Sequence, residues 1–289
     1  MHDAVPSQKK PDAPRGKRSP VVLRDHVWDA EVCGGLVALK GHTSRIFPVK
    51  STKGKFIKEF SRGSRLRMLK MVARINWSKV KKGVFITLTC PDAVWPKWKE
   101  HGVSYRHRFF RDTENYLCKK FGCLWRVEWK PRESGAYKGI VLPHIHLLVP
   151  NVAFIAKEVV KSLWKGACQC KGECITWIDA LDSKEKHAVY IAKYCAKYSP
   201  LSVLDYVAQL NNTGRHWGKH RPSLIPMHES EYYENITLES VAELRGMAAC
   251  NLPWYDHDTD PGFSIFGKKG IELAAVARRI LLDAGERRR

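Results

Sequence analysis

The sequence predicts an α+β fold in which antiparallel strands pack with helices. Residues 123–129 alternate apolar and polar side chains, and residues 142–150 form an apolar run rich in Leu, Ile and Val; both patterns are typical of strands. Residues 130–141 between them contain Pro131, Gly135 and Gly139, which predicts a turn and hence an antiparallel pair. Apolar residues at helical spacing in 105–121 and 152–165 predict one helix before this pair of strands in the chain and one after it.

The other expected elements follow from the same periodicities. In chain order they are a small hairpin within 21–60, an amphipathic basic helix at 64–77, strands at 84–89 and 175–178, and helices at 184–198, 201–210 and 271–283. The composition divides the chain into a disordered basic arm (1–20), a basic N-terminal extension (21–80), a central domain (81–222) and a C-terminal helical extension (223–289).

The charge of the chain predicts a polyanionic partner. Its 289 residues carry a net charge of +21, which favours nucleic acid over a membrane because no lipidation or amphipathic anchor signal is present. No run of 18 apolar residues and no signal-peptide core occur, so a cytoplasmic protein without membrane partners is expected. Nine scattered cysteines suit reduced thiols better than a disulfide framework.

Two histidines open the apolar run at 142–150. His144 and His146 stand at i and i+2, so a strand would present both imidazoles on one side of a sheet, about 7 Å apart. Such a pair can hold one divalent ion, although two polar residues on a half-exposed strand explain an isolated His-x-His as well. A metal also needs a carboxylate. Glu128, on the neighbouring strand, is the favoured third ligand, and Glu133, in the turn, is the alternative.

The predicted helix at 184–198 carries a second chemical pattern. Tyr190, Lys193, Tyr194 and Lys197 fall on one helix face, opposite a stripe of small and apolar residues. A tyrosine hydroxyl can attack a phosphodiester when a metal polarises the phosphate and a cation such as Lys193 favours the phenolate. A second tyrosine one turn away could attack the next junction. The alternative is an ordinary interfacial surface of tyrosines and lysines.

Three cysteines lie close together after the helix at 152–165. Cys168, Cys170 and Cys174 are expected to be solvent-exposed reduced thiols. The alternative is a structural zinc site with a fourth ligand such as Cys123 or His187, although the Cys-x-Cys-x-x-x-Cys spacing is not a standard knuckle.

Three of these stretches stand in the order of known family motifs. Phe85-Ile86-Thr87-Leu88-Thr89, Pro143-His144-Ile145-His146-Leu147-Leu148 and Tyr190-Ile191-Ala192-Lys193-Tyr194 resemble the motifs of HUH endonucleases. Most similar are the two-tyrosine rolling-circle replication initiators of small single-stranded-DNA phages and plasmids. The resemblance covers roughly residues 80–222, and Arg215-His216-Trp217-Gly218 resembles a further stretch of such initiators.

The resemblance implies a central antiparallel sheet flanked by helices, with a ferredoxin- or RRM-like core. It implies Mg²⁺- or Mn²⁺-dependent nicking of one strand at a replication origin, which leaves a 3′-hydroxyl and a 5′-phosphotyrosine, and rejoining that releases a circular strand. His144, His146 and Glu128 would then be metal ligands, and Tyr190 and Tyr194 nucleophiles assisted by Lys193. The side chains expected to bind DNA are Lys197, Arg215, Lys219 and Arg221.

The resemblance also implies partners and leaves alternatives. Single-stranded or origin DNA would be bound in a bacterial host cytoplasm, together with a host polymerase. A host helicase would be needed because no G-x-x-x-x-G-K-[ST] phosphate loop occurs in the chain. One alternative is a transposase or relaxase with the same chemistry. The other is a basic nucleic-acid-binding protein without activity.

Overall fold

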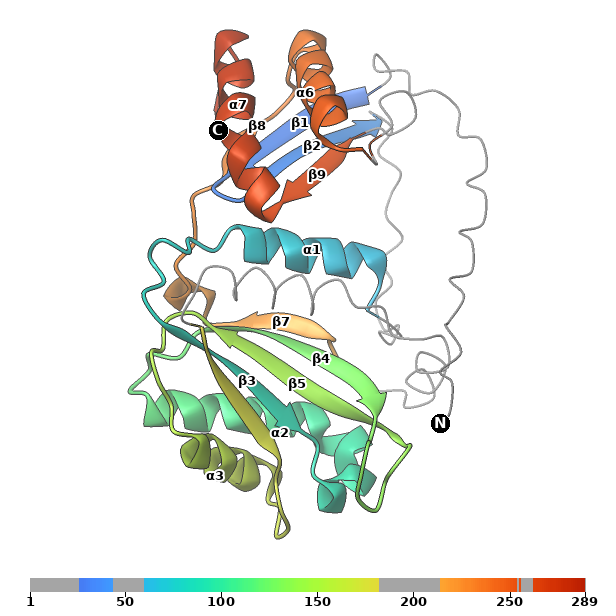
Figure 1. Ribbon diagram of the computed structural model, residues 1–289, viewed down its shortest axis with the longest axis vertical. Helices are drawn as coiled ribbons and strands as arrows, with labels where there is room; N and C mark the ends of the chain where they lie inside the picture. Colours follow the sequence, from blue (N-terminus) through green and yellow to red (C-terminus); the bar gives the residue numbers. More distant parts are fainter. Residues whose placement is uncertain (1–25, 44–59, 182–213, 254, 256–261, 289) are drawn as a thin grey trace, which may run out of the picture.

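The computed structural model describes residues 26–43, 60–181, 214–253, 255 and 262–288. In them the predicted α+β fold, with antiparallel sheets and flanking helices, is confirmed (Figure 1). The strands are β1 (His26–Cys33), β2 (Leu36–Thr43), β3 (Gly83–Thr89), β4 (Cys123–Pro131), β5 (Val141–Val149), β6 (Thr176–Leu181), β7 (Trp217–His220), β8 (Glu231–Tyr233) and β9 (Phe263–Phe266). The helices are α1 (Arg62–Ala73), α2 (Trp98–Tyr116), α3 (Lys157–Cys168), α6 (Leu238–Asn251) and α7 (Gly267–Asp283), with 3-10 turns η2 (Asp92–Lys97) and η3 (Pro222–Leu224).

Five strands form the larger sheet, in the order β6-β3-β5-β4-β7, and every neighbouring pair is antiparallel. The consecutive elements β3, α2, β4, β5, α3 and β6 give the βαββαβ connectivity of a ferredoxin-like fold. The expected pairing of β4 with β5 across the proline- and glycine-containing turn is found. This connectivity puts β5, the strand with the two histidines, in the middle of the sheet.

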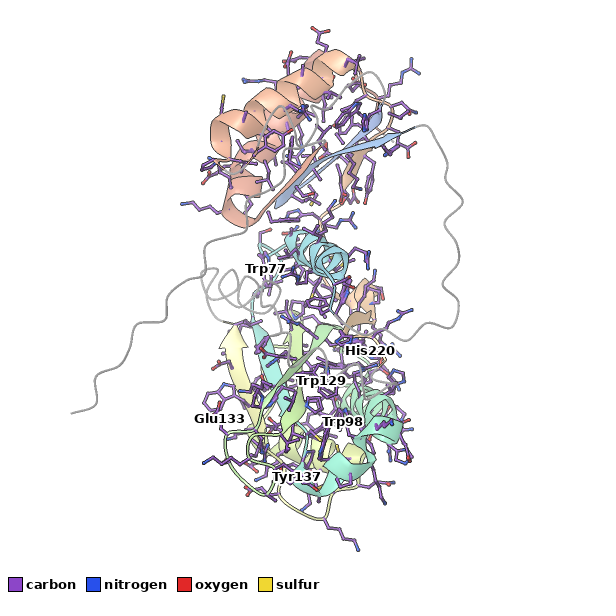
Figure 2. The ribbon with its side chains drawn as sticks, turned by 90° about the vertical axis from the view of Figure 1, so that its right-hand side faces the viewer. Trp77, Trp98, Trp129, Glu133, Tyr137 and His220 are labelled. Carbon is purple, nitrogen blue, oxygen red and sulfur yellow. The ribbon has the colours of Figure 1, made fainter. Side chains whose placement is uncertain are left out.

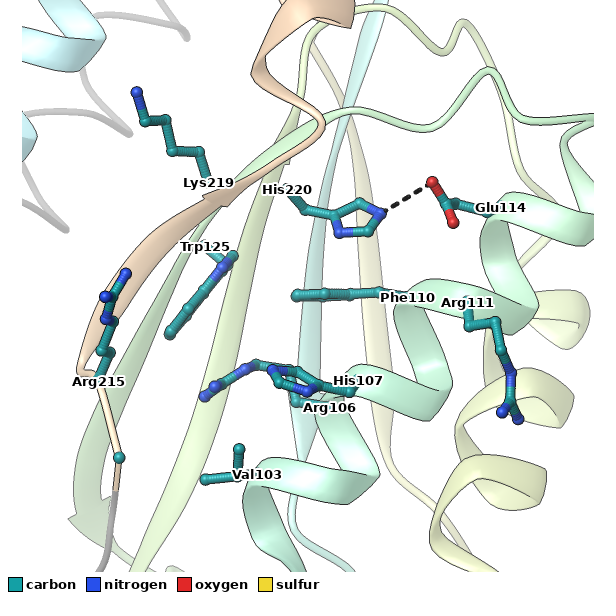
Figure 3. Close-up of a pocket in the computed structure, with 11 residues that line it drawn as sticks. Val103, Arg106, His107, Phe110, Arg111, Glu114, Trp125, Arg215, Lys219 and His220 are labelled. Carbon is teal, nitrogen blue, oxygen red and sulfur yellow. Dashed lines mark ion pairs between the residues drawn. The ribbon is translucent and has the colours of Figure 1, made fainter.

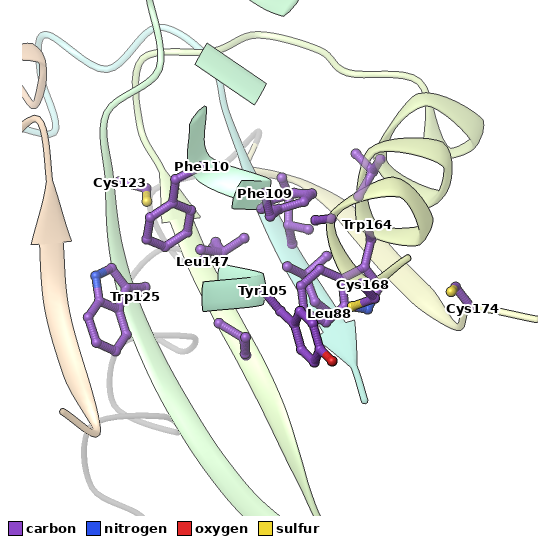
Figure 4. Close-up of a cluster of buried hydrophobic side chains, with 14 of the residues drawn as sticks. Leu88, Tyr105, Phe109, Phe110, Cys123, Trp125, Leu147, Trp164, Cys168 and Cys174 are labelled. Atoms are coloured by element: carbon purple, nitrogen blue, oxygen red, sulfur yellow. The ribbon is translucent and has the colours of Figure 1, made fainter. Parts of the chain in front are cut away.

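One side of this sheet, the helix face, packs against α2 and α3. Alternate strand residues point to it, among them Ile86, Trp125 and Ile145, and they join Phe109 of α2 and Trp164 of α3 in one buried cluster (Figure 4). Phe109 and Trp164 are fully buried and pack edge to face, 5.8 Å between ring centroids. Burial of such large side chains contributes roughly 1.5–3 kcal/mol each, so this cluster fixes both helices on the sheet.

The opposite side, which we call the histidine face, is also covered at one end. Phe85, Leu124 and Leu148 pack there against Met68 and Val72 of α1. The alternation at 123–129 predicts a strand with one exposed side, and that expectation is wrong: β4 is buried on both sides over its first seven residues.

Helix α1 runs between the two sheets rather than over a solvated surface (Figure 1). It begins after Ser61, whose hydroxyl accepts a hydrogen bond from the Ser64 amide, the usual capping arrangement. In the amphipathic helix expected at 64–77, the helical spacing puts Leu66 in the apolar stripe and Arg65 between the apolar positions; in the structure Arg65 is buried and Leu66 is exposed. The reason is that the helix has two packing partners, so its contacts do not follow a single apolar face.

The smaller sheet has the order β8-β1-β2-β9 and is packed with α6 and α7. The expected N-terminal hairpin is present, with Gly34-Gly35 as its two-residue loop, and the helix expected at 271–283 is α7. The sequence-based division treats 21–80 and 223–289 as separate extensions. The strand pairing instead joins them, because β8 and β9 flank the hairpin on its two edges.

A buried ion pair connects α1 to the smaller sheet. Glu31 of β1 is buried, and its carboxylate accepts a hydrogen bond of 2.9 Å from Nε of Arg74, which caps the C-terminus of α1. A second nitrogen of the same guanidinium, Nη2, also donates to Glu31 and to the Tyr232 hydroxyl. Since a buried charge is costly without a partner, this pair ties the hairpin to α1.

Some boundaries differ from expectation. Helix α2 begins before residue 105 because η2, which contains Pro96, leads into it, and it ends at Tyr116, before Cys118 and Lys119 adopt positive φ. The helices expected at 184–198 and 201–210 lie outside the described residues, as does the basic arm at 1–20. In the part of the chain that the structure describes, no helix has the length and apolarity needed to cross a membrane.

Candidate functional site

The two histidines lie side by side on the histidine face, near one end of β5. His144 pairs across the sheet with Thr89 of β3 and Glu128 of β4, and His146 pairs with Thr87. Directly opposed residues on antiparallel strands share a face, with Cβ atoms about 4.5–5.5 Å apart. The geometry expected of Glu128, on the same side as both histidines, is therefore present.

Hydrogen bonds hold both imidazoles in defined orientations. Thr87 Oγ1 lies 3.0 Å from Nδ1 of His146, and Thr89 Oγ1 lies 3.3 Å from Nδ1 of His144. Nε2 of His146 lies 2.9 Å from Oε2 of Glu128. Sequence reasoning missed the two threonines, although their own i, i+2 spacing on the adjacent strand matches that of the histidines. When one ring nitrogen of an imidazole binds a metal, a hydrogen bond at the other nitrogen fixes the tautomer and the orientation of the ring.

The two ring nitrogens of His144 differ in their contacts. Its Nε2 is buried and has no hydrogen-bond partner among the described residues. Burial, together with the positive side chain of Lys130, lowers the pKa of His144 to about 3. The imidazole is therefore neutral at physiological pH and has a lone pair available when its proton is on Nδ1. A buried polar atom without a partner is uncommon and marks a candidate ligand position.

The donor set fits a divalent cation, but the side chains do not yet converge on one. Two imidazoles, one of them held neutral by burial, and one carboxylate, all on one sheet, suit a first-row divalent metal. Over the described residues, however, no three His, Cys, Asp or Glu side chains are already arranged to hold an ion. One reason is that Glu128 is engaged with His146. Metal binding here would have to replace that hydrogen bond.

Glu133, the alternative third ligand, is placed differently. Its side chain is 87% exposed and lies 3.8 Å from Nζ of Lys130. It stands in the turn between β4 and β5 at the edge of the molecule, where Figure 2 labels it. Of the two carboxylates weighed from the sequence, Glu128 is the one beside the histidines.

The expected nucleophiles and DNA-binding residues are only partly described. Tyr190, Lys193, Tyr194 and Lys197 lie outside the described residues. Arg215 and Lys219 are exposed at the edge strand β7 or just before it. Arg221, just after β7, is ion-paired with Glu114 of α2, so its charge is partly neutralised.

The cysteine loop is not solvent-exposed, contrary to expectation. Cys168, Cys170 and Cys174 are each 5% exposed or less and belong to the buried cluster under the sheet, together with Cys90 (Figure 4). The chain buries them because α3 ends at Cys168 and Gln169 turns it back with positive φ. Burial raises the pKa of Cys174 to about 12, which favours the neutral thiol.

The zinc alternative gains no support. Cys123, one of the suggested fourth ligands, lies beside Phe110 and Trp125, away from Cys168 and Cys174 in Figure 4. His187, the other, lies outside the described residues. Over the described residues, these thiols are not part of any group of three His, Cys, Asp or Glu side chains that could hold a metal ion.

Comparison with protein-family models, with curated proteins and with solved structures finds no match. What the site can do therefore follows from its own chemistry. It presents two oriented imidazoles on the central strand β5 and a carboxylate on the neighbouring strand β4, in a chain of high positive charge.

Proposed function

We propose that this protein is a site-specific single-strand DNA endonuclease and strand transferase that initiates rolling-circle replication. The observation that carries the proposal is the site on β5. Its two histidines and Glu128 share one face of a ferredoxin-like sheet, and a buried Nε2 of His144 is without a partner among the described residues. The high positive charge of the chain supports a nucleic-acid substrate.

Three side chains would hold the cation, Mg²⁺ or Mn²⁺. His144 and His146 would use Nε2, while Thr87 and Thr89 keep the opposite nitrogens oriented. Glu128 would add a carboxylate oxygen and negative charge. When bound, such an ion polarises the non-bridging oxygens of the scissile phosphate and makes phosphorus more electrophilic.

The nucleophile in this proposal is a tyrosine of the segment Tyr190-Ile191-Ala192-Lys193-Tyr194. The phenol oxygen forms a bond to phosphorus as its proton is lost, and the bond from phosphorus to the 3′-oxygen breaks. That oxygen takes a proton and leaves as a 3′-hydroxyl, and the DNA 5′-phosphate stays on the tyrosine. A phenol has a pKa of about 10 in water, so a nearby cation such as Lys193 would favour the phenolate.

The experiment is a covalent-adduct assay with strand-specific labels. A pool of single-stranded oligonucleotides of randomised sequence is labelled at the 3′ end or the 5′ end and incubated with the full chain and Mn²⁺. We expect the 3′ label to migrate with the protein on a denaturing gel, and the 5′ label to appear in short fragments that a polymerase can extend. Chelation with EDTA should abolish both products.

Two other outcomes would overturn this proposal. Tight, salt-sensitive DNA binding without any adduct, over a wide range of oligonucleotides and metals, indicates a binding protein without activity. A 5′-labelled adduct indicates cleavage of the opposite polarity. A transposase or relaxase gives the same adduct as an initiator, and an initiator is distinguished by repeated rounds of strand synthesis and strand release from one circular template when a host helicase and polymerase are added.

A first prediction concerns the carboxylate ligand. Glu128→Gln keeps the size of the side chain but removes its charge, so we expect the Mn²⁺ concentration needed for half-maximal adduct formation to rise about 10- to 100-fold. Glu133→Gln is the matched control and should leave the titration unchanged, since that side chain is exposed in the turn. The opposite pattern would move the third ligand to Glu133.

A second prediction concerns the threonines that orient the imidazoles. Thr87→Val and Thr89→Val keep the shape of each side chain but delete the hydroxyl that contacts Nδ1. We expect each variant to bind Mn²⁺ about 10-fold more weakly by calorimetry. Thr176→Val is the control, because that buried threonine lies on β6 and its hydroxyl has no hydrogen-bond partner among the described residues. Equal affinities in all four proteins would contradict an orienting role.

A further inference from the structure

A second polar site lies on the other side of the larger sheet. A cavity of about 620 Å³ opens between α2 and the edge strand β7 (Figure 3). Trp125 of β4 forms one wall, and it belongs to the helix face, opposite the histidines. Its lining includes Arg106, Arg215, Trp125 and Glu114, and we call this cavity the Arg106 pocket.

Arg106 is a buried cation for which none of the described residues supplies an anion. It is 4% exposed, and its guanidinium lies 3.8 Å from the centroid of the Trp125 ring. Its Nε is buried and makes no hydrogen bond to any described residue, and no carboxylate in the described part of the chain pairs with it. Stacking on an indole provides some compensation, but a desolvated guanidinium ordinarily needs an anionic partner.

The charges around Arg106 increase its need for an anionic partner. Arg215 lies near enough to lower the pKa of Arg106, which burial and this neighbour together reduce to about 10. Glu114 is the single carboxylate among the described residues that line the pocket. It is already engaged by Nε2 of His220 at 3.2 Å and by Arg221. The end of the pocket between Arg106 and Arg215 is therefore positive and unneutralised.

Glycines allow the backbone of the 214–220 segment to approach this wall. Gly218 of β7 pairs with Trp125, and a Cβ at Gly218 would lie 2.6 Å from the indole ring. Gly214 has a φ of +67°, and a Cβ there would lie 2.9 Å from the Val103 side chain. A larger residue at Gly218 would displace Trp125 or the strand, and one at Gly214 would displace Val103 and strain the backbone. The close approach of the 214–220 segment to Trp125 and Val103 therefore depends on these two glycines, which lie on either side of Arg215 in the sequence.

We propose that the Arg106 pocket binds a backbone phosphate of single-stranded DNA, held between the guanidinium groups of Arg106 and Arg215. The choice of DNA rests on the proposed function; the need for an anion does not. Guanidinium groups are the preferred partners of phosphate oxygens because they donate paired hydrogen bonds. Arg106 covers a face of the Trp125 ring and Phe110 is buried, so neither of these two rings is offered to a base, and a phosphate contact is independent of sequence.

The position suits a strand that leaves the histidine face around the edge of the sheet. From β5, which carries the histidines, the order continues through β4 to β7, two strand spacings or about 10 Å. Strand β7 is the edge, so DNA can turn around it without crossing the sheet. The pocket would hold the strand beyond the site of cleavage and supply affinity without taking part in the chemistry.

The experiment measures binding of a fluorescent single-stranded oligonucleotide by anisotropy, over a series of salt concentrations and with EDTA to prevent cleavage. Arg215→Gln, an exposed substitution, and Arg106→Met should each weaken binding several-fold. Each should also reduce the slope of log affinity against log salt by about 0.7, the value for one phosphate contact. Arg108→Gln is the matched control: it removes the same charge from the same helix outside the pocket, and should leave the slope unchanged.

Thermal unfolding separates this role from a structural one. Met preserves contact with the indole, and Arg106→Met removes a desolvated cation, so the variant should unfold at the same or a higher Tm than the wild type without DNA. A saturating oligonucleotide should then raise the Tm of the wild type by more degrees than that of the variant. A variant with a clearly lower Tm and an unchanged salt slope would mean that Arg106 acts only in packing.

Further outcomes also decide the matter. If Arg106→Met does not fold, Arg215→Gln alone carries the test, and a wild-type slope in that variant overturns the proposal. If inorganic phosphate raises the Tm of the wild type but not of Arg215→Gln, while oligonucleotide binding is equal, the pocket serves a small phosphate compound instead of DNA. Failure of the proposed function shows separately, as the absence of a covalent adduct from the wild type with Mn²⁺.

Discussion

Replacing both Tyr190 and Tyr194 by Phe should abolish the covalent protein–DNA adduct. Phenylalanine keeps the ring but lacks the hydroxyl whose oxygen would bond to phosphorus, so no other atom of the side chain can replace it. The loss should reach the detection limit of the denaturing gel, while single-strand binding without metal stays within about twofold of wild type, since phosphate contacts dominate it.

Single substitutions make the test more specific. Tyr190→Phe and Tyr194→Phe should each retain some adduct through the remaining tyrosine, since the two are one helical turn apart in the sequence pattern. Each should fail to complete transfer and release of a circle, which needs a free hydroxyl while the other is esterified. Tyr198→Phe and Tyr206→Phe are the controls. An adduct that persists in the double variant, or maps to either control tyrosine, would remove the two-tyrosine mechanism.

Replacing both His144 and His146 by Ala should reduce metal-dependent nicking on the order of 1,000-fold. The estimate follows from the several kcal/mol that a bound cation contributes to the stabilisation of charge on a reacting phosphate. Single-strand binding in EDTA should persist, because the side chains removed are on the sheet and not among the exposed Lys and Arg. The measurement is the initial rate of 3′-label transfer over a Mn²⁺ series.

The two histidines differ in what else they support. Removing His146 leaves the buried Glu128 without its 2.9 Å partner, which costs about 1–3 kcal/mol of stability. Among the described residues, the ring nitrogens of His144 bond to the Thr89 hydroxyl alone, so His144→Ala is the variant that tests activity with least effect on folding. His101→Ala, on the exposed surface of α2, controls for loss of an imidazole. Unchanged nicking in His144→Ala would contradict the site.

The sequence predicted the strands, turn and helices of the larger sheet because their signals are local, whereas the ferredoxin-like core was implied by the family resemblance. The β-branched run of β3, the alternation of β4 and the proline- and glycine-containing turn before β5 each act within a few residues. It did not predict that α1 would bury Arg65 or that β4 would be covered on both sides. Those facts depend on contacts between segments far apart in the chain, which no periodicity records.

The candidate site residues also differ in whether a local pattern in the sequence reveals them. His144, His146 and Glu128 were found because side-chain alternation and one turn fix their common face. Arg106 was not found, because on a helix with many charged residues an arginine has the pattern of a solvated side chain. Only the burial of its guanidinium against Trp125 distinguishes it.

The pairing of the hairpin β1–β2 with β8 and β9 has a consequence for synthesis of the chain. The strands of the larger sheet all leave the ribosome before β8 and β9, so that sheet can assemble first. The hairpin, made earliest, has two open edges until the last strands arrive, a delay of many seconds at roughly 5–20 residues per second. Exposed edges invite pairing with other chains, so we expect nascent chains stalled after β7 to aggregate through β1–β2 although their histidine site is already formed.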